Sequence, residues 1–430
     1  MNLDSLLTQI EQAQLARRSP EVDPTYIFKH ALVQEAAYAS LLKQDRKRLH
    51  QRVGEALERR TLRVDQLAEY AAQLAQHFTA AGDDAKALEY SIRAGDIAAQ
   101  RNASAEARWH YARVLDVLRR LPDNDENRRC RMGALVKQVG VSVFTAEPAV
   151  NLARLAEAET LAQEFASADA RIQRQLAQIY FWNGFIHLMG NETRETLYDY
   201  QKEGELAQAS GDDQLAANAA FDTAVVLNFH GRFGAAGPLF EESMELMSKA
   251  GKSLDDVGAQ QHYGVSLAAR GDVAIGLAQA HQGLARAQSQ GALEVTYDVL
   301  AAIHYISRNF HHMATSRHVV EIAAPLGDAV MVFSGNMLCA WAQSHLGQHQ
   351  AAIETIAPNR KIAEIFHGRI LGIDLLAAVE CEAALNAGRI AEAVGMAEQA
   401  IALARSLDNL WSEGVAQRVW GQALAFQHQF

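Results

Sequence analysis

Few residues in this 430-residue chain could carry out chemistry, and they form no catalytic motif. No Ser, Cys or Thr stands in a nucleophile motif, and no carboxylate pair stands out. The segment 250–253, Ala-Gly-Lys-Ser, matches the end of a phosphate-binding loop. Such a loop needs a preceding strand and another glycine five residues earlier, where Leu246 stands. We therefore predict that Gly251 ends a helix, and we predict no catalytic residue and no cofactor.

The densest group of imidazoles lies around residue 310 and comprises His304, His311, His312 and His318. Metal ligands must converge on one point, usually with support from a carboxylate or thiolate. A predicted turn at Asn309 places these histidines on two helices, so their spacing does not guarantee convergence. A metal site and a set of packed or solvent-facing histidines are the two interpretations, and we predict no metal site.

A basic segment lies near the start of the chain, where residues 43–63 carry eight Lys or Arg and three acids. A basic helix face can bind phosphate or an acidic partner. The alternative is a solvated face in which Glu55 and Glu58 pair with cations at helical spacing. The candidate binding residues on this face are Lys43, Arg46, Lys47, Arg48 and Arg52.

The clearest structural pattern is the segment 213–251, which predicts two antiparallel helices. Apolar residues at helical spacing stop at His230 and resume after Arg232, so the two helices meet at Gly231. Ala224 stands seven residues before this glycine and Ala236 five residues after it. Two small side chains are thus expected opposite each other where the helices cross, which allows the backbones to approach closely.

The same spacing recurs around six predicted turns, at Gly82, Gly231, Gly271, Asn309, Gly347 and Gly388. The residues seven positions before these turns are all small, namely Ala75, Ala224, Gly264, Ala302, Ala340 and Cys381. The residues five positions after them are Ala87, Ala236, Gly276, Ala314, Ala352 and Ala393. Gly190 fits the period of about 40 residues, but its partners Asn183 and Glu195 are larger, so that unit is either degenerate or shifted in register.

A fixed period in this range is typical of a solenoid, and these residues resemble the tetratricopeptide repeat (TPR). The resemblance runs from about residue 66 to the end of the chain. Its units are longer than the usual unit of about 34 residues, which implies helices longer by a turn. The predicted fold is all-α, a right-handed superhelix (solenoid) of antiparallel helical hairpins with elongated TPR-like repeats.

A second resemblance lies at Tyr26–Leu42, which is expected to form a brief strand leading into a helix. Together with Arg46–Glu58, this segment resembles the junction between a degenerate winged-helix module and the TPR region of STAND-type signalling ATPases. Such ATPase and repeat regions occur in multidomain bacterial nucleotide cyclases and related transcription regulators. In those proteins the catalytic modules precede the junction, so we expect a C-terminal portion of such a protein or a descendant without them.

Composition restricts the class of protein further. The chain is 49% hydrophobic and 21% charged, and its net charge is −11, so it should fold and should not bind nucleic acid or anionic membrane along its whole length. The cysteines, Cys130, Cys339 and Cys381, are far apart, which argues against a zinc site or a disulfide framework. No signal peptide or membrane-spanning segment is apparent, and a cytoplasmic location is expected.

Four segments are predicted: 1–45, a remnant of a winged-helix module with a junction helix; 46–121, N-terminal hairpins; 122–170, a linker and an irregular hairpin; and 171–430, the TPR-like array. The array ends near Trp420, where a further first helix is expected to begin without a partner or polar cap. That edge predicts self-association or a continuation of the array.

The predicted function is a non-catalytic regulatory module that binds a protein or peptide in a concave groove. A nucleotide-dependent enzyme and a DNA-binding regulator are the alternatives. In TPR proteins the groove is lined by first-helix residues, and the corresponding positions here are His187, Phe221, Asn228, Ile306, Met337 and Ser344. Asn228 and His187 border apolar runs, so each either faces the groove or is satisfied inside the core. Trp182, Trp341, Trp411 and Trp420 are expected in the core.

Overall fold

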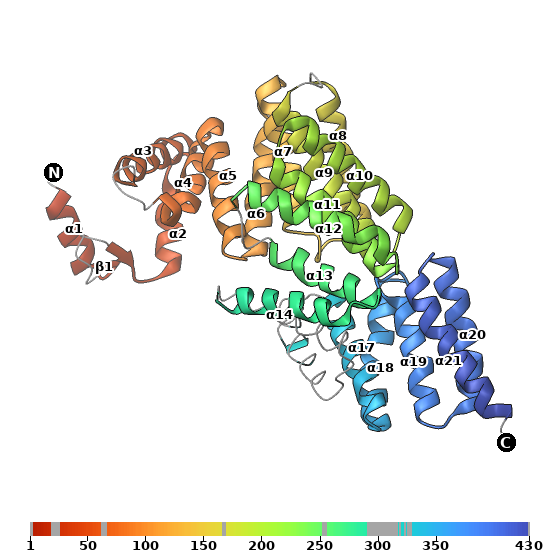
Figure 1. Cartoon of the computed structure of the whole chain (residues 1–430). Helices are drawn as coiled ribbons and strands as arrows, with labels where there is room; N and C mark the ends of the chain where they lie inside the picture. The colour runs from red at the N-terminus through yellow and green to blue at the C-terminus, as the bar shows by residue number, and fades with distance from the viewer. Residues whose placement is uncertain are drawn as a thin grey trace. The chain divides into compact units, whose positions relative to one another are not determined.

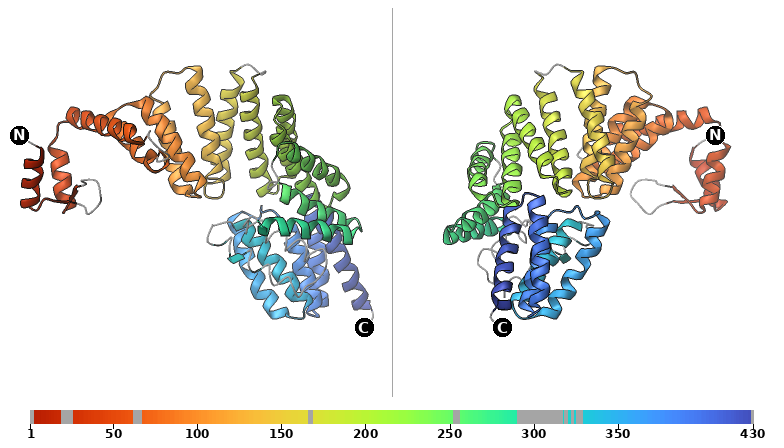
Figure 2. Two further views of the ribbon diagram at one scale, coloured as in Figure 1. Left: turned by 60° about the vertical axis from the view of Figure 1, so that its left-hand side comes forward. Right: turned by 90° about the vertical axis from the view of Figure 1, so that its right-hand side faces the viewer.

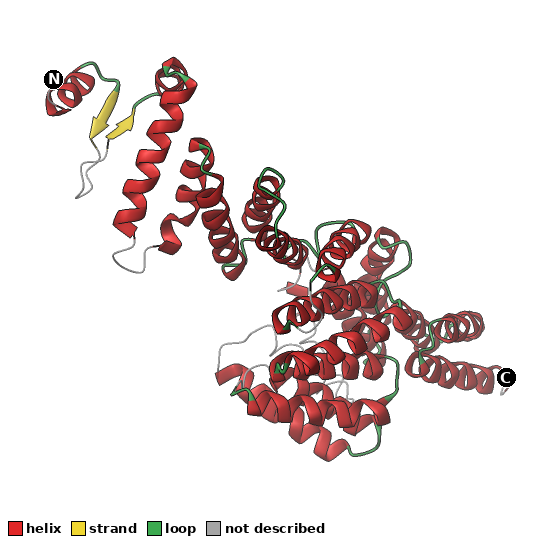
Figure 3. Cartoon of the chain, turned by 90° about the horizontal axis from the view of Figure 1, so that it is seen from above, coloured by secondary structure: helices red, strands yellow, loops and turns green. Residues whose placement is uncertain are grey.

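A computed structural model describes residues 3–18, 26–61, 67–165, 169–251, 256–289 and 329–428, together with positions 317, 320, 321 and 324. The chain divides into two compact units, Met1–Val141 and Ser142–Phe430. This division falls within the segment 122–170, where the sequence predicts an irregular hairpin. Apart from one pair of short strands, all regular elements of the described residues are helices (Figure 3).

The first unit begins with a helix and the two strands (Figure 1). The strands β1 (Ala16–Arg18) and β2 (Tyr26–Phe28) pair antiparallel, with Ala16 opposite Phe28. The sequence predicts the strand at Tyr26–Phe28 but not its partner. The helices of this unit are α1 (Leu3–Gln12), α2 (Ala31–Ser40), α3 (Lys43–Thr61), α4 (Leu67–Ala81), α5 (Asp84–Gln100), α6 (Ser104–Leu118) and α7 (Asp125–Gly140). From α3 onward each of them packs against the next.

The second unit contains the longer array, and its helices pair as consecutive antiparallel hairpins (Figure 2). The described helices are α8 (Pro148–Gln163), α9 (Ala170–Met189), α10 (Thr193–Ser210), α11 (Asp213–Phe229), α12 (Phe233–Lys249), α13 (Asp256–Ala269) and α14 (Val273–Ser289). They continue with α17 (Ala329–His345), α18 (His349–Ile365), α19 (Ile373–Asn386), α20 (Ile390–Ser406) and α21 (Leu410–His428). The predicted all-α architecture of sequential hairpins is confirmed.

Small residues occupy the helix crossings, as the sequence predicts. Ala224 and Ala236 are fully buried on α11 and α12. Gly264 and Gly276 approach so closely that a Cβ built on Gly264 would lie 2.7 Å from the carbonyl oxygen of Gly276. Such contact leaves no space for a larger side chain, which explains why these positions hold only small residues. The unit predicted around Asn309 lies outside the described residues.

The irregular unit at Gly190 is shifted by one residue. Gly190 has an ordinary negative φ of −81°, whereas Asn191 adopts the left-handed conformation with φ of 57°. Counted from Asn191, the position seven residues earlier is Gly184, where an added Cβ would lie 2.5 Å from the Tyr200 ring. Five residues after it stands Thr196, which is fully buried. The shifted interpretation of this unit is therefore the right one.

An additional turn of the same kind lies at Asn102, with φ of 57°, between α5 and α6. Gly95, seven residues earlier, would place a Cβ 2.6 Å from the Tyr111 ring, and Ala107, five residues later, is fully buried. This turn was not predicted, because it follows the turn at Gly82 after only 20 residues, half the period of about 40 on which the predicted turns were chosen.

Two predictions at helix ends have different outcomes. Gly251 follows the end of α12 with φ of +71°, so it is the predicted helix-terminating glycine. The prediction that a first helix begins at Trp420 is wrong, since α21 begins at Leu410 and Trp420 lies in its middle. The helix starts early because the side-chain oxygen of Asn409 accepts hydrogen bonds from the backbone N–H groups of Trp411 and Ser412, each 3.1 Å long.

Candidate functional site

The turn between α11 and α12 contacts the turn between α20 and α21. The Asn409 side chain donates a 3.0 Å hydrogen bond to the Phe229 carbonyl, and the Leu410 N–H donates a 3.2 Å bond to the His230 carbonyl. Arg232 and Asp408 form an ion pair alongside them. In an open repeat array each repeat contacts only its neighbours, whereas these residues are up to 180 positions apart. The second unit therefore folds back on itself.

A second pair of turns strengthens this fold-back. The Leu371 N–H donates a 3.3 Å hydrogen bond to the Met189 carbonyl, and the Arg369 guanidinium lies 3.2 Å from the Glu192 carboxylate. At the first contact the backbones meet at Gly231, where φ is +73° and an added Cβ would lie 2.7 Å from the Trp411 nitrogen. Only glycine satisfies both conditions.

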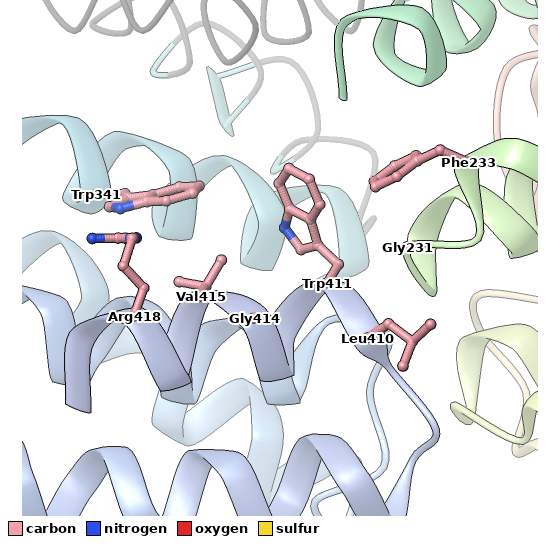
Figure 4. A pocket seen from close by; sticks show the side chains of 8 residues that line it. All are labelled: Gly231, Phe233, Trp341, Leu410, Trp411, Gly414, Val415 and Arg418. Carbon is pink, nitrogen blue, oxygen red and sulfur yellow. The ribbon is translucent and has the colours of Figure 1, made fainter. Parts of the chain in front are cut away.

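A pocket of about 290 Å³ lies beside this contact, and we call it the seam pocket (Figure 4). Its residues come from α17, from α21, from the turn between α11 and α12 and from the first residue of α12. They are Gly231, Phe233, Trp341, Leu410, Trp411, Gly414, Val415 and Arg418. Phe233 and Trp411 meet edge to face with their ring centres 5.2 Å apart. The pocket is thus mostly apolar, and Arg418 is the one charged residue among those that line it.

A buried carboxylate holds two of the lining side chains. Glu382 on α19 is 2% exposed and accepts hydrogen bonds from Trp341 Nε1 at 2.8 Å and Arg418 Nη2 at 2.7 Å. His345 Nε2 lies 3.3 Å from the same carboxylate. Burial alone would raise the pKa of Glu382, but the hydrogen bonds from His345, Arg418 and Trp341 and the charge of Arg418 outweigh it and lower the pKa to about 2. Glu382 is therefore ionised and fixes the indole and the guanidinium in place.

The elements that position these groups are three alternate helices of the array. Trp341, Glu382 and Arg418 lie on α17, α19 and α21, and α19 packs against both α17 and α21. On α21 the lining residues Trp411, Val415 and Arg418 follow at intervals of four and three, which places them on one helix face. This spacing is visible in the sequence, but the tryptophans were expected only in the core.

The predicted groove residues do not gather on one open surface. Asn228 is 7% exposed and donates a 2.9 Å hydrogen bond to the His262 carbonyl, so the structure favours a core role for it. Met337 and Ser344 are also buried, and Ser344 accepts a 2.9 Å bond from Asn386. These three positions face neighbouring helices because each hairpin is tightly flanked by the next.

The other predicted groove residues have different settings. His187 is one-fifth exposed and lies 2.8 Å from Asp199, and this hydrogen bond is the main reason why its pKa is raised. Phe221 is half-buried against Phe240, with ring centres 6.2 Å apart. Ile306 lies outside the described residues, as do His304, His311, His312 and His318 of the predicted imidazole group.

The basic candidates lie on α3 as a mostly exposed set. Lys43, Lys47, Arg48 and Arg52 are exposed. Arg46 is half-buried, and its guanidinium carbon lies 5.2 Å from the centre of the Tyr38 ring. A role of this face in binding stays a prediction.

The cysteines Cys130, Cys339 and Cys381 are all unpaired. Within the described ranges, His, Cys, Asp and Glu side chains form no group of three or more that could hold a metal ion. Among the helices that the structure describes, none is both long and apolar enough to span a membrane.

The fold and this site define a TPR-like helical repeat protein. No protein-family model matches the chain, and no curated protein matches it in sequence. Solved structures match its fold. A Rap protein complexed with Competence and Sporulation Factor is 10% identical, with a TM-score of 0.56, over 80% of this chain and 99% of that one.

Two related structures match similarly. Aspartyl phosphate phosphatase F from Bacillus subtilis is 11% identical, with a TM-score of 0.52, over 67% of this chain and 74% of that one. The apo form of RapI is 12% identical, with a TM-score of 0.50, over 64% of this chain and 97% of that one. At such low identity these likenesses show the fold alone, and the expected relation to signalling ATPases stays a prediction.

Proposed function

We propose that this chain is a non-catalytic regulatory protein that binds a peptide or protein segment, and that the seam pocket holds part of that segment. The observation that carries the proposal is the seam pocket itself, an apolar recess with two tryptophans, one phenylalanine and a single fixed cation. Aromatic residues and arginine dominate the energetics of partner binding. A Rap protein of similar fold has been crystallised with Competence and Sporulation Factor, which supports a partner of this kind.

The size of the seam pocket limits what it can hold. At about 290 Å³ it lies at the lower limit of the range of about 300–1,000 Å³ for small-molecule sites. It therefore suits one or two large apolar side chains of an extended partner. Arg418 has donors left for a carboxylate or carbonyl of that partner, because a guanidinium carries five N–H groups. The bridge to Glu382 prevents it from swinging away.

The proposal is tested with a random peptide library displayed on phage and selected against the full chain. Gly414 on α21 is exposed, and an added Cβ there would meet nothing within 4 Å, so Gly414→Leu fills the pocket without strain. Gly421 is a matched control on the same helix, exposed and equally open but outside the pocket. Selected peptides should bind wild type and Gly421→Leu equally, and Gly414→Leu at least about tenfold more weakly.

A library that yields no binder would contradict the proposal, as would binders that are insensitive to Gly414→Leu. The alternatives expected from the sequence, a nucleotide-dependent enzyme and a DNA-binding regulator, stay predictions. A rise in melting temperature with ATP and magnesium, or tight salt-dependent binding of duplex DNA, would favour one of them. The cytoplasmic location and self-association through the C-terminal edge also remain expectations.

A further inference from the structure

Helix α3 in the first unit packs mainly through the face that meets α4, and Tyr38 of α2 contacts its His50 and Arg46. On that face an added Cβ at Gly54 would lie 3.0 Å from the Phe78 ring, and His50 Nδ1 lies 3.0 Å from His77 Nδ1. Glu58 forms a 2.6 Å ion pair with Lys86 on α5. These contacts account for α3 as a member of the helical array, and they use one side of the helix.

A second apolar stripe on α3 faces away from those contacts. It consists of Leu49, Val53 and Ala56, which lie within about 60° of one another around the helix axis, and we call it the α3 stripe. Leu49 is 42% exposed and Val53 is 41% exposed, and Ala56 is exposed as well. Leu42, directly before the helix, is 72% exposed. Successive apolar residues at spacings of four and three form the pattern with which a helix packs on another helix.

Cations follow one edge of this stripe. Arg48, Arg52 and Arg59 are exposed and lie within about 40° of one another around the axis, beside the α3 stripe. Arg48 makes a 3.0 Å ion pair with Asp45, but both side chains are well exposed, so this pair contributes at most about 1 kcal/mol. Arg48 can therefore leave Asp45 and pair with a carboxylate of a partner. The whole helix carries seven Lys or Arg and three acids, in a chain whose net charge is −11.

We propose that the α3 stripe docks an amphipathic α-helix of a partner protein, one whose apolar side chains are flanked by Asp or Glu that face the arginine edge. The charge complementarity is that of paired helices, in which apolar side chains interdigitate and flanking charges select the partner. The 19 residues of α3 present a surface about 28 Å long, enough for five turns of a partner helix.

An anionic membrane is the competing ligand for a basic amphipathic helix. The arrangement of the arginines favours the protein partner. Three of the four exposed arginines of α3, Arg48, Arg52 and Arg59, lie along one edge of the stripe, whereas a helix lying in a membrane surface has cations across its polar face.

The test uses a fluorescein-labelled, 21-residue designed helix with leucines along one stripe and glutamates on both flanks, titrated with the full chain by anisotropy. A second peptide has lysine in place of every glutamate. The glutamate peptide should bind at least about tenfold more tightly than the lysine peptide. Val53→Glu and Arg52→Glu should each weaken that binding about tenfold or more, and thermal melting should confirm that both variants are folded.

Trp109→Glu is the matched control, because Trp109 is another half-exposed apolar residue of the first unit, on α6. It should leave binding unchanged. Equal binding of both peptides, absence of binding, or binding insensitive to Val53→Glu would overturn the proposal. So would a stronger response to phosphatidylserine vesicles than to the glutamate peptide, which would assign the face to membranes. The seam pocket variants do not enter this test, so its outcome is independent of the function proposed for the second unit.

Discussion

The indole N–H of Trp341 donates a 2.8 Å hydrogen bond to the carboxylate of Glu382, 41 residues further along the chain. The separation equals about one repeat, so the bond joins equivalent helices of successive hairpins. Glu382 also accepts a 2.7 Å hydrogen bond from the Arg418 guanidinium on α21. One carboxylate therefore connects three helices, α17, α19 and α21, beneath the seam pocket.

Replacement of this carboxylate should cost stability. Removing one partner of a buried ion pair costs about 3–5 kcal/mol, and because Arg418 is 36% exposed we expect about 1–3 kcal/mol for Glu382→Gln. The lowered pKa of Glu382 means that its contribution is present above the unfolded-state pKa and is lost as pH falls toward about 2. Urea unfolding at pH 7 and pH 3 measures the free energy of unfolding of wild type and variant, and the difference between them should be smaller at pH 3. An equal difference at both pH values would show that Glu382 does not form an ionised bridge.

The opposite pH dependence is expected at Glu203 on α10. This side chain is 1% exposed and one of its oxygens has no partner, and burial, followed by the charge of Asp222, raises its pKa. A carboxyl group whose pKa is raised in the folded state contributes stability at low pH, and this stability is lost as pH rises through the folded-state pKa. Glu203→Gln should therefore be more stable than wild type by about 1–3 kcal/mol at pH 9.

The gain from Glu203→Gln should shrink toward pH 5, where the carboxyl of the unfolded chain approaches its ordinary pKa and also becomes protonated. Glu205→Gln is the control, since Glu205 lies on the same helix but is exposed and paired with Lys202. It should show no such gain. Chemical denaturation across this pH range distinguishes the two, and a destabilising Glu203→Gln at pH 9 would argue against the assignment.

The close helix crossing at Gly184 predicts a strong response to one methyl group. An added Cβ would lie 2.5 Å from the buried Tyr200 ring, so Gly184→Ala should cost about 1–3 kcal/mol. Gly395 on α20 meets nothing within 4 Å, and Gly395→Ala should be neutral or stabilise the helix by up to about 1 kcal/mol. Thermal melting of both variants is the measurement. Similar melting temperatures would mean that the crossing is looser than described.

A substitution at Asn228 tests whether this residue belongs to the core or lines a partner groove. Asn228→Ala removes the donor to the His262 carbonyl, and the expected cost is about 1–3 kcal/mol because a buried hydrogen bond and the packing of the amide are both lost. A change below about 0.5 kcal/mol, as for an exposed position, would restore the groove interpretation. Denaturant unfolding of the full chain decides between them.

The parts of the structure that follow from local spacing could be predicted from the sequence. The pairing of Ala224 with Ala236 across a turn is a property of one hairpin, so the repeat, the fold class and the helix-terminating Gly251 all appear in the pattern. The turn at Asn102 was missed because it falls 20 residues after Gly82, outside the period of about 40 residues that guided the prediction of turns.

The seam pocket could not be predicted in the same way. Phe233 and Trp411 share it only because the chain folds back over more than 170 residues, and local periodicity contains no information about such a contact. Burial at Met337 and Ser344 depends equally on how closely the next hairpin packs. The sequence does show that Trp411, Val415 and Arg418 share one helix face. That this face forms a wall of a pocket follows only from the positions of α17 and α19 in the structure.

The contact between Asn409 and Phe229 also has a consequence for synthesis on the ribosome. The two residues are 180 positions apart, and at about 5–20 residues per second the second emerges about 10–40 s after the first. During that interval the α11–α12 hairpin must persist on its own contacts, with Phe233 lacking its Trp411 neighbour. The nascent chain therefore passes through a long stage in which Phe233 is accessible to chaperones or to other chains. Trp411 covers it only after the last helix has been made.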